Sequence, residues 1–547
     1  MTSASRWFRA VPTPAAAVVA LLMAASMTAC SSVEPDSGAG KNEDNFGKPP
    51  PANLKSGGAL TVALASEPDK LDPSLGRSLV GRQVFHAMCE KLYDLDQNVE
   101  VQPQLASDLP DVSDDGLTVT IPLRDGIEFA DGTPFNAAAV KQSLDRHVTM
   151  PESARVSELG PIDEVTAEDD QTVVIKLKKP FAPLTAALAD RAGMVMSPKA
   201  LNKLGDDFSS APVCVGPFKF EKRVPQSSIE LVKDPNYYDA DKVKLDRLEY
   251  RIVVDASIRA ANLQSDDIQV ADTVSTQDAA DLAGKKGLEV LQSNSLGYQG
   301  ITFNTGNVKG LGEPPGKIDT PLASDPRVRQ AFEHAIDREA ISTRVFNGYH
   351  RPACSPISPE TAYTSDRAQE CRDHDPAKAK KLLKQAGVKT PFKIKMSVTN
   401  TPDTLRLAQA LQAMVKDGGF DLSIEPVEFS TLLDQQDRGD FEAIQIGWSG
   451  RVDPDANITQ FIYTQGSQNV GGYSDSEVDE LLDTARGQQD PDDRAKTYAE
   501  MIDKVQDDNP LVYLYRQRNL TGVSTDIGGV QVFQDGIIRV AFAGQMP

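Results

Sequence analysis

Residues 447–451, with the sequence GWSGR, come close to a known catalytic motif. Hydrolases with a G-x-S-x-G motif place their nucleophilic serine on a sharp turn between a strand and a helix. Here Arg451 stands where the last glycine belongs. The sequence motifs of zinc proteases, phosphate-binding loops and dinucleotide-binding folds are absent as well. We therefore expect no enzymatic activity and no cofactor, with a secreted hydrolase as the weakest alternative.

Metal-binding patterns are also missing. No cysteine or histidine pair has the spacing of a zinc site, and the carboxylates, although abundant, follow no pattern. We predict no metal site. We also expect each of the five scattered histidines to lie at the surface or in a satisfied core position: His86, His147, His334, His350 and His374.

Four cysteines follow residue 58, and their even number fits two disulfides in an exported protein. Cys354 and Cys371 are close in sequence and flank a loop-like stretch, so we pair them. Cys89 and Cys214 then form the second pair by default. Buried free thiols are the alternative.

The first 30 residues have the pattern of an export signal. Two arginines precede an apolar run at 15–25, and small residues then lead to Cys30. This order is typical of a secretory signal peptide, and the apolar run is too short to span a bilayer comfortably. A cysteine directly after small residues resembles a lipobox, although Met27 replaces the commoner leucine. We predict a lipoprotein signal peptide at 1–29 and lipidation of Cys30, with plain secretion as the alternative.

Residues 30–57 are rich in serine, glycine, proline and charge, and they show no apolar period. This composition predicts a flexible tether. The protein would then be held at the outer face of the cytoplasmic membrane by its lipid alone, because no other stretch is long and apolar enough for a transmembrane helix.

The chain has 547 residues, with 57 Lys and Arg against 79 Asp and Glu, and a formal net charge of −22. An acidic protein is a poor binder of nucleic acid, because neutralising phosphates requires a basic surface. The length corresponds to roughly two to four domains.

Strand-like and helix-like segments alternate irregularly after residue 58, which favours an α/β fold with mixed sheets. Asp325 and Pro326 are suited to start a helix that we expect to continue to Gly348. Further helices are expected after Asp375, Ser474 and Asp490. Strand-like runs lie at 59–64, 117–123, 172–177, 228–232, 248–254, 392–398, 422–427 and 443–448.

Several segments together resemble the extracellular solute-binding proteins of family 5, the peptide, dipeptide and nickel receptors of ABC importers. The matches follow one another in order over roughly residues 58–515. They are LRDGIEFADGTPFN at 123–136, VGPFKF at 215–220, DPNYY at 234–238, RVRQAFEHAIDR at 327–338 and the Gly447-Trp448 pair.

The resemblance implies a two-lobe, type II periplasmic-binding-protein-like fold with an extra subdomain, mixed β-sheets and a hinged cleft. Lobe I would comprise 58–85, 206–299 and 511–547, with the extra subdomain at 86–205. Lobe II would comprise 300–510. The implied function is capture of dipeptides or oligopeptides between the lobes and delivery to the permease and ATPase subunits of the importer, by a monomer.

In peptide-binding members, the segment after Gly-Trp lines the cleft and an Asp there meets the ammonium of the peptide. By similarity, Gly447, Trp448 and Ser449 would contact the ligand through their backbone. Tyr298 and Asn304 are further candidates, from a family-like stretch that crosses between the lobes.

The family's Asp is replaced by Arg451, and three hypotheses follow. Arg451 faces the cleft and binds a ligand carboxylate; or a shifted loop lets Asp453 take the ammonium; or Arg451 ties Asp453 or Asp455 into a rigid turn. A receptor for an anionic or metal-chelate solute and a sensory receptor therefore stay open as alternatives. The sequence does not identify the ligand.

Overall fold

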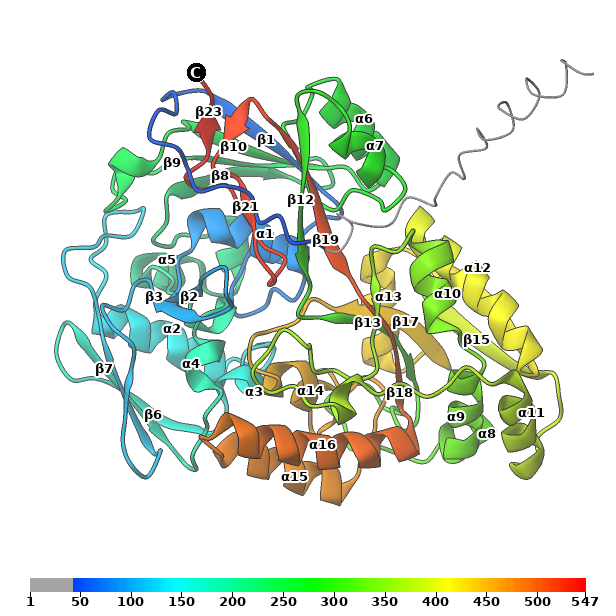
Figure 1. Cartoon of the computed structure of the whole chain (residues 1–547). Helices are drawn as coiled ribbons and strands as arrows, with labels where there is room; N and C mark the ends of the chain where they lie inside the picture. Colours follow the sequence, from blue (N-terminus) through cyan, green and yellow to red (C-terminus); the bar gives the residue numbers. More distant parts are fainter. Residues whose placement is uncertain (1–42) are drawn as a thin grey trace, which may run out of the picture. The chain divides into compact units, whose positions relative to one another are not determined.

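The computed structural model describes residues 43–547. Residues 44–547 form one compact unit of mixed α/β structure built around two large sheets (Figure 1). The predicted signal peptide and Cys30 lie outside the described residues. Within residues 43–547, no helix combines the length and apolar character needed to cross a membrane.

The first large sheet has seven strands in the order β12-β19-β11-β1-β10-β9-β8. Its central strand β1 runs parallel to both neighbours, whereas the outer pairs are antiparallel, so the sheet is mixed. The strands are β1 (Ala59–Leu64), β8 (Phe218–Val224), β9 (Ser228–Lys233), β10 (Arg247–Ile252), β11 (Val270–Ala271), β12 (Leu288–Asn294) and β19 (Arg518–Ser524).

A smaller four-stranded sheet, β4-β5-β7-β6, shares one continuous hydrophobic core with the first large sheet. Helices of this half cover both sheets. The strands are β4 (Asp111–Val112), β5 (Thr118–Pro122), β6 (Ile162–Ala167) and β7 (Thr172–Leu177). The helices are α1 (Leu79–Met88), α2 (Ala137–Thr149), α3 (Val156–Leu159), α4 (Leu184–Ala187), α5 (Pro198–Leu204), α6 (Ala256–Gln264) and α7 (Ala279–Ala283).

The second large sheet has six strands in the order β14-β18-β13-β17-β15-β16 and a hydrophobic core of its own. The strands are β13 (Tyr298–Phe303), β14 (Arg351–Pro352), β15 (Phe392–Thr399), β16 (Phe420–Val427), β17 (Ala443–Trp448) and β18 (Leu511–Arg516). The helices are α8 (Pro321–Ser324), α9 (Pro326–His334), α10 (Arg338–Ala340), α11 (Pro376–Gln385), α12 (Pro402–Asp417), α13 (Phe429–Arg438), α14 (Asp455–Ile462), α15 (Ser476–Gly487) and α16 (Pro491–Asp508).

Short two-stranded ribbons complete the structure. They pair β2 (Tyr93–Leu95) with β3 (Val101–Pro103), β20 (Ile527–Gly528) with β23 (Gly544–Gln545), and β21 (Gln531–Val532) with β22 (Ile538–Arg539).

Two short crossings join the large sheets. Residues 295–297 connect β12 to β13, and Gln517 alone connects β18 to β19 (Figure 1). Because β13 and β18 are neighbours in one sheet and β12 and β19 in the other, the two crossings lie at the same place. Few residues can therefore absorb any rotation of one sheet against the other. The predicted lobe boundaries at 299/300 and 510/511 fall at β13 and β18, and they stay a prediction.

Local signals explain where several helices begin. The Asp325 side chain accepts a hydrogen bond from the Arg327 amide, and Pro326 occupies the first turn, as expected. The expected continuous helix to Gly348 is wrong, however. Helix α9 ends at His334, and Asp337 caps α10 by accepting from the Ala340 amide, so an internal capping residue divides the segment.

Residues from Asp44 onward, which the composition assigned to the tether, make backbone hydrogen bonds to the body. The Asn45 amide donates to the Gln292 carbonyl at 2.8 Å, and the Lys55 amide donates to the Gln545 carbonyl at 2.9 Å. Leu54 is buried. Polar composition does not reveal such pairing, because the bonds involve only the main chain.

The structure joins Cys89 to Cys214 and Cys354 to Cys371, the same pairs that the sequence suggested. The first bridge fastens the end of α1 to the segment before β8. The second closes a loop beside α16.

Gly297, in the longer crossing, allows a close approach that any side chain would prevent. A Cβ atom there would lie 1.8 Å from the Trp448 carbonyl oxygen. We expect Gly297→Ala to lower the free energy of unfolding by about 1–3 kcal/mol, the usual cost of overpacking, measured by thermal or urea denaturation. Gly487→Ala is the control, because a Cβ at Gly487 has no atom within 4 Å. Equal stability of the two variants would contradict the packing described.

Candidate functional site

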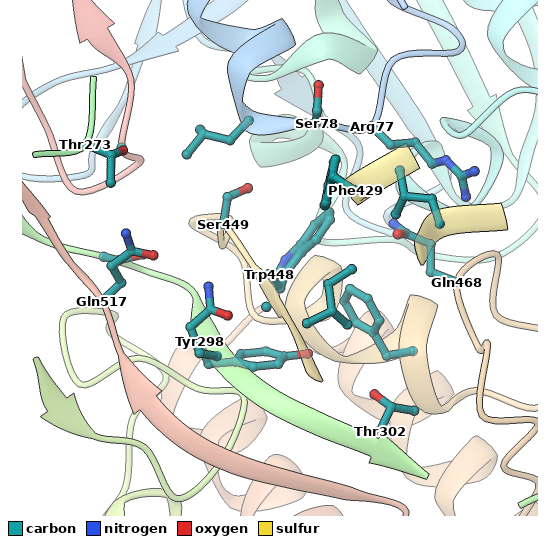
Figure 2. Close-up of a pocket in the computed structure, with 18 of the residues that line it drawn as sticks. Arg77, Ser78, Thr273, Tyr298, Thr302, Phe429, Trp448, Ser449, Gln468 and Gln517 are labelled. Carbon is teal, nitrogen blue, oxygen red and sulfur yellow. The ribbon is translucent and has the colours of Figure 1, made fainter. Parts of the chain in front are cut away.

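A cavity of about 220 Å³ lies between the two large sheets, beside the crossings (Figure 2). Its lining is mostly uncharged: four aromatic rings, five amide side chains and several hydroxyls. These are Tyr298, Phe429, Trp448 and Phe461; Gln299, Gln436, Gln468, Gln517 and Asn519; and Ser78, Thr273, Ser295, Thr302, Ser449 and Thr521. Arg77 and Asp272 are the charged residues among the lining residues.

The aromatic wall is fixed by ring contacts and one hydrogen bond. Trp448 meets Phe461 edge-on, with ring centroids 5.0 Å apart, and the Trp448 Nε1 donates to the Asn457 side-chain oxygen at 2.9 Å. Tyr298 meets Tyr513 edge-on at 4.8 Å. Rings held in this way present a preformed apolar surface to a ligand.

Strand β17 offers a backbone edge at the cavity. On one side it pairs with β13 along its full length, as far as Trp448 opposite Tyr298. On the other side it pairs with β15 only at Ala443 and Ile444. From residue 445 onward, no strand within the described part of the chain covers this second edge. A ligand with an extended backbone could therefore pair with β17 where Gly447 and Trp448 line the cavity.

Gly450 turns the chain away from the cavity directly after Ser449. Its φ is +82°, a conformation that favours glycine, and a Cβ there would lie 2.3 Å from the Gly297 amide nitrogen. The turn carries Arg451 behind Trp448. The Arg451 guanidinium lies 4.3 Å from the centroid of the Trp448 ring.

Arg451 is buried and forms an ion pair with Asp190, with 2.5 Å between Arg451 Nε and an Asp190 oxygen. Asp190 precedes a short turn on the side of the first sheet, so this pair joins the two halves of the molecule. Arg82 of α1 approaches Asp190 at 3.2 Å. Burial opposes the ionisation of Asp190, but Arg451, Arg82 and Arg191 hold its pKa well below its usual range.

The other two aspartates considered as partners of Arg451 belong to other arginines. Asp453 forms two hydrogen bonds of 2.8 Å with Arg494, and Asp455 pairs with Arg486 at 2.7 Å. The expectation that Arg451 ties one of these aspartates into a turn is therefore wrong. The reason is that α15 and α16 bring their own arginines to this loop.

Of the seven ligand-contact residues expected from the sequence, four line the cavity: Gly447, Trp448, Ser449 and Tyr298. Arg451, Asp453 and Asn304 do not. The Asn304 side chain instead donates to the carbonyls of Asn307 and Gly439 and so holds a turn. A direct ligand contact by these three residues stays a prediction without support from the cavity geometry.

Sequence reasoning missed most of the other lining residues, including Arg77, Asp272, Phe429, Gln468 and Gln517. They come from separate loops and helices, and they belong to no local motif. Of these separate segments, only the one around Gly447 carries a sequence motif that predicts a place in the cavity wall.

Further contacts join the two halves around the cavity. Arg77 pairs with Asp437 of α13 at 2.8 Å, and Lys179 pairs with Asp483 of α15 at 2.9 Å. The Ala182 amide donates to the Arg486 carbonyl at 2.9 Å. The lobes therefore hold the cavity between them in this arrangement.

Within the described residues, no group of three or more histidine, cysteine, aspartate or glutamate side chains could hold a metal ion.

Asp190 is the shared counter-ion of several buried arginines, which leads to a stability prediction. Asp190→Asn should lower the free energy of unfolding by about 3–5 kcal/mol, because it leaves buried cations unpaired. Arg451→Met should cost less, since Asp190 keeps Arg82. Urea denaturation measures both.

Asp440→Asn is the matched control. Its pair with Arg438 is exposed, at 62% and 59% of the side-chain surface, so its loss should cost less than about 1 kcal/mol. A smaller effect of Asp190→Asn than of Arg451→Met would contradict the assignment of Asp190 as the shared partner.

Comparison with known proteins supports the same fold and family. Residues 100–469 match the model of the bacterial extracellular solute-binding proteins, family 5, middle region. The glutathione-binding protein GsiB of Salmonella typhi is 30% identical over 489 residues, which cover 87% of this chain and 92% of GsiB.

Solved structures agree. The binding protein AgaA of A. tumefaciens R10, in complex with agropinic acid, is 27% identical, with a TM-score of 0.79 over 89% of this chain and 98% of AgaA. DppA of Helicobacter pylori, in complex with the peptide STSA, shares the fold with a TM-score of 0.80, over 90% of this chain and 99% of DppA at 24% identity.

The predicted two-lobe fold with mixed sheets is thereby confirmed. The order of motifs in the sequence, the cavity between two sheets joined by short crossings, and the match over residues 100–469 lead to one conclusion: this chain belongs to the bacterial extracellular solute-binding proteins of family 5, the extracytoplasmic solute receptors of ABC importers.

Proposed function

We propose that this protein captures a short peptide in the cavity between its lobes and presents it to the permease of an ABC importer. The ligand leaves chemically unchanged, because the role of the protein is binding. The protein acts as a monomer, and its lobes are divided near the two crossings.

The uncovered edge of β17 is the observation that carries the peptide assignment. Backbone pairing with an extended ligand gives affinity without reading side chains, which suits a receptor for mixed peptides. Gly447 adds no side chain at this edge, and Trp448 and Tyr298 flank it with apolar surface.

The size of the cavity supports a small ligand. The volume of about 220 Å³ lies below the roughly 300–1,000 Å³ of most ligand pockets, which favours a small ligand such as a dipeptide or tripeptide. A purely anionic solute is less well supported, because Arg77, the cation of the cavity wall, already pairs with Asp437.

Lobe closure supplies the signal that the transporter reads in this proposal. Hinged closure around a ligand is a common two-state device. The two short crossings and the ion pairs across the cavity, such as Arg451 with Asp190, fit a molecule whose lobes separate to admit the ligand and meet to enclose it.

The test is to purify the chain as its host processes it, record its native mass, and then denature it and identify what it releases. We expect one or more dipeptides or tripeptides, and a decrease in the radius of gyration by small-angle scattering when these peptides are added back. A single non-peptide solute would overturn the peptide assignment. No closure with any peptide or non-peptide pool would overturn the receptor function itself.

The proposed lipid anchor makes a separate prediction. Cys30→Ser removes the only thiol that can be acylated beside the predicted cleavage site. We expect the variant to move from the membrane fraction to the soluble extracytoplasmic fraction with unchanged thermal stability, since residues 44–547 form a compact unit of their own. Continued membrane association of Cys30→Ser in the absence of other transporter subunits would rule out the anchor.

A further inference from the structure

Asp272 is the carboxylate of the cavity wall. It follows directly on β11 of the seven-stranded sheet, only 4% of its surface is exposed, and it lies among the residues that line the cavity. No sequence motif marks it, and it lies across the cavity from the aromatic wall in the other lobe. A buried carboxylate at a ligand cavity needs a partner for its charge.

The protein gives this carboxylate only neutral partners. The Ala65 amide donates to one oxygen at 3.3 Å, and the Thr273 hydroxyl donates to the other at 2.9 Å. Among the described residues, no lysine, arginine or histidine nitrogen lies within the 4.0 Å of an ion pair with Asp272.

The nearest arginine is committed elsewhere. Arg259 of α6 donates from Nη1 to the carbonyls of Val253 and Val254, at 2.7 and 2.9 Å, and from Nη2 to the carbonyl of Thr273 at 2.5 Å. The positive charge of Arg259 therefore stabilises the ionised form of Asp272 from a distance. Its guanidinium forms no ion pair with the Asp272 carboxylate.

Thr273 has a strained backbone, and this conformation allows it to contact both Arg259 and Asp272. Its φ is +53°, a conformation that β-branched residues rarely adopt. In this conformation its carbonyl faces Arg259 while its hydroxyl stays on Asp272. Thr273 also lines the cavity, on the side opposite Phe429 and Gln468 in Figure 2.

The charges of the cavity wall do not cancel. Arg77 is neutralised by Asp437 at 2.8 Å, whereas Asp272 forms no ion pair within the described residues and is influenced only by the more distant charge of Arg259. Burial raises the pKa of the Asp272 carboxyl, and the charge of Arg259 and the hydrogen bonds from Thr273 and Ala65 offset this rise only in part.

We infer that Asp272 receives a primary ammonium group of the ligand. This inference rests on the proposed function and deepens it, because it names the group that the receptor recognises. The ammonium is the α-amino group of a peptide if the peptide assignment holds, and otherwise that of a small amine. The charge site then lies in the lobe opposite to Arg451.

The test measures binding by isothermal titration to the host-processed chain. The probes are a pool of dipeptides and tripeptides, the same pool after N-acetylation, and the diamine putrescine. N-acetylation removes the positive charge and preserves the rest of each peptide. We expect the free peptides to bind, and the acetylated pool to bind at least about thirtyfold more weakly, as for truncation of a buried charge pair.

The variant Asp272→Asn preserves the shape of the side chain and one acceptor oxygen. Its affinity for the free peptides should fall by about the same factor as acetylation causes. Asp267→Asn is the matched control, because it makes the same change of charge at an exposed residue outside the cavity. It should bind within about twofold of the unmodified protein. Melting temperatures of both variants check that they fold, and the acetylation arm needs no variant at all.

The possible failures are distinguishable. Equal binding of free and acetylated peptides, or full affinity in a folded Asp272→Asn variant, overturns the ammonium site and leaves the peptide receptor intact. Binding of putrescine but not of peptides, lost in Asp272→Asn, supports the ammonium site and overturns the peptide assignment. Binding of no probe, together with no released ligand, overturns the proposed function.

Discussion

The two short crossings between the sheets are the constraint on which the rest of this structure depends. Residues 295–297 connect β12 to β13, and Gln517 connects β18 to β19. These two segments carry the chain between the two large sheets. Because the crossing at 295–297 packs directly against the chain from Trp448 to Gly450, hinge and ligand wall are in contact. Any rotation at the crossing must therefore move the cavity wall as well.

Charge is distributed unequally around this hinge. Behind Trp448, arginines and aspartates are buried at high density, and each pair links separate segments, as Arg451 does with Asp190 and Arg494 with Asp453. In front of Trp448, Arg77 and Asp272 are the charged residues of the cavity wall. A buried ion pair contributes little net stability compared with apolar packing, but removing one partner is costly. The pairs behind the wall thus fix one arrangement of segments, and the amides, hydroxyls, rings and Asp272 of the cavity wall are left to meet the ligand.

Local signals in the sequence predicted local structure well. Asp325 and Pro326 start a helix because capping involves only neighbouring residues, and the segment 447–449 lines the cavity as its resemblance implied. Long-range pairs could not be predicted in this way. Asp190 and Arg451 are 261 positions apart, and the sequence around each residue contains no signal that predicts their contact. The internal cap at Asp337 was equally visible in the sequence, but the apolar stripe around it suggested a continuous helix.

The replacement at Arg451 and the unpaired carboxylate of Asp272 have a joint consequence for lobe closure. A ligand shifts the equilibrium between open and closed lobes only by its difference in affinity for the two states. The pair of Arg451 with Asp190 joins the lobes without any ligand, so it favours closure regardless of what the cavity holds. A ligand bound to β17 alone would have the same affinity for the open and the closed lobes, because it contacts only one of them. If Asp272 receives the ammonium, a ligand whose backbone pairs with β17 also contacts the other lobe. Such a ligand is bound by both lobes, and only a ligand of this kind binds more tightly when the lobes close.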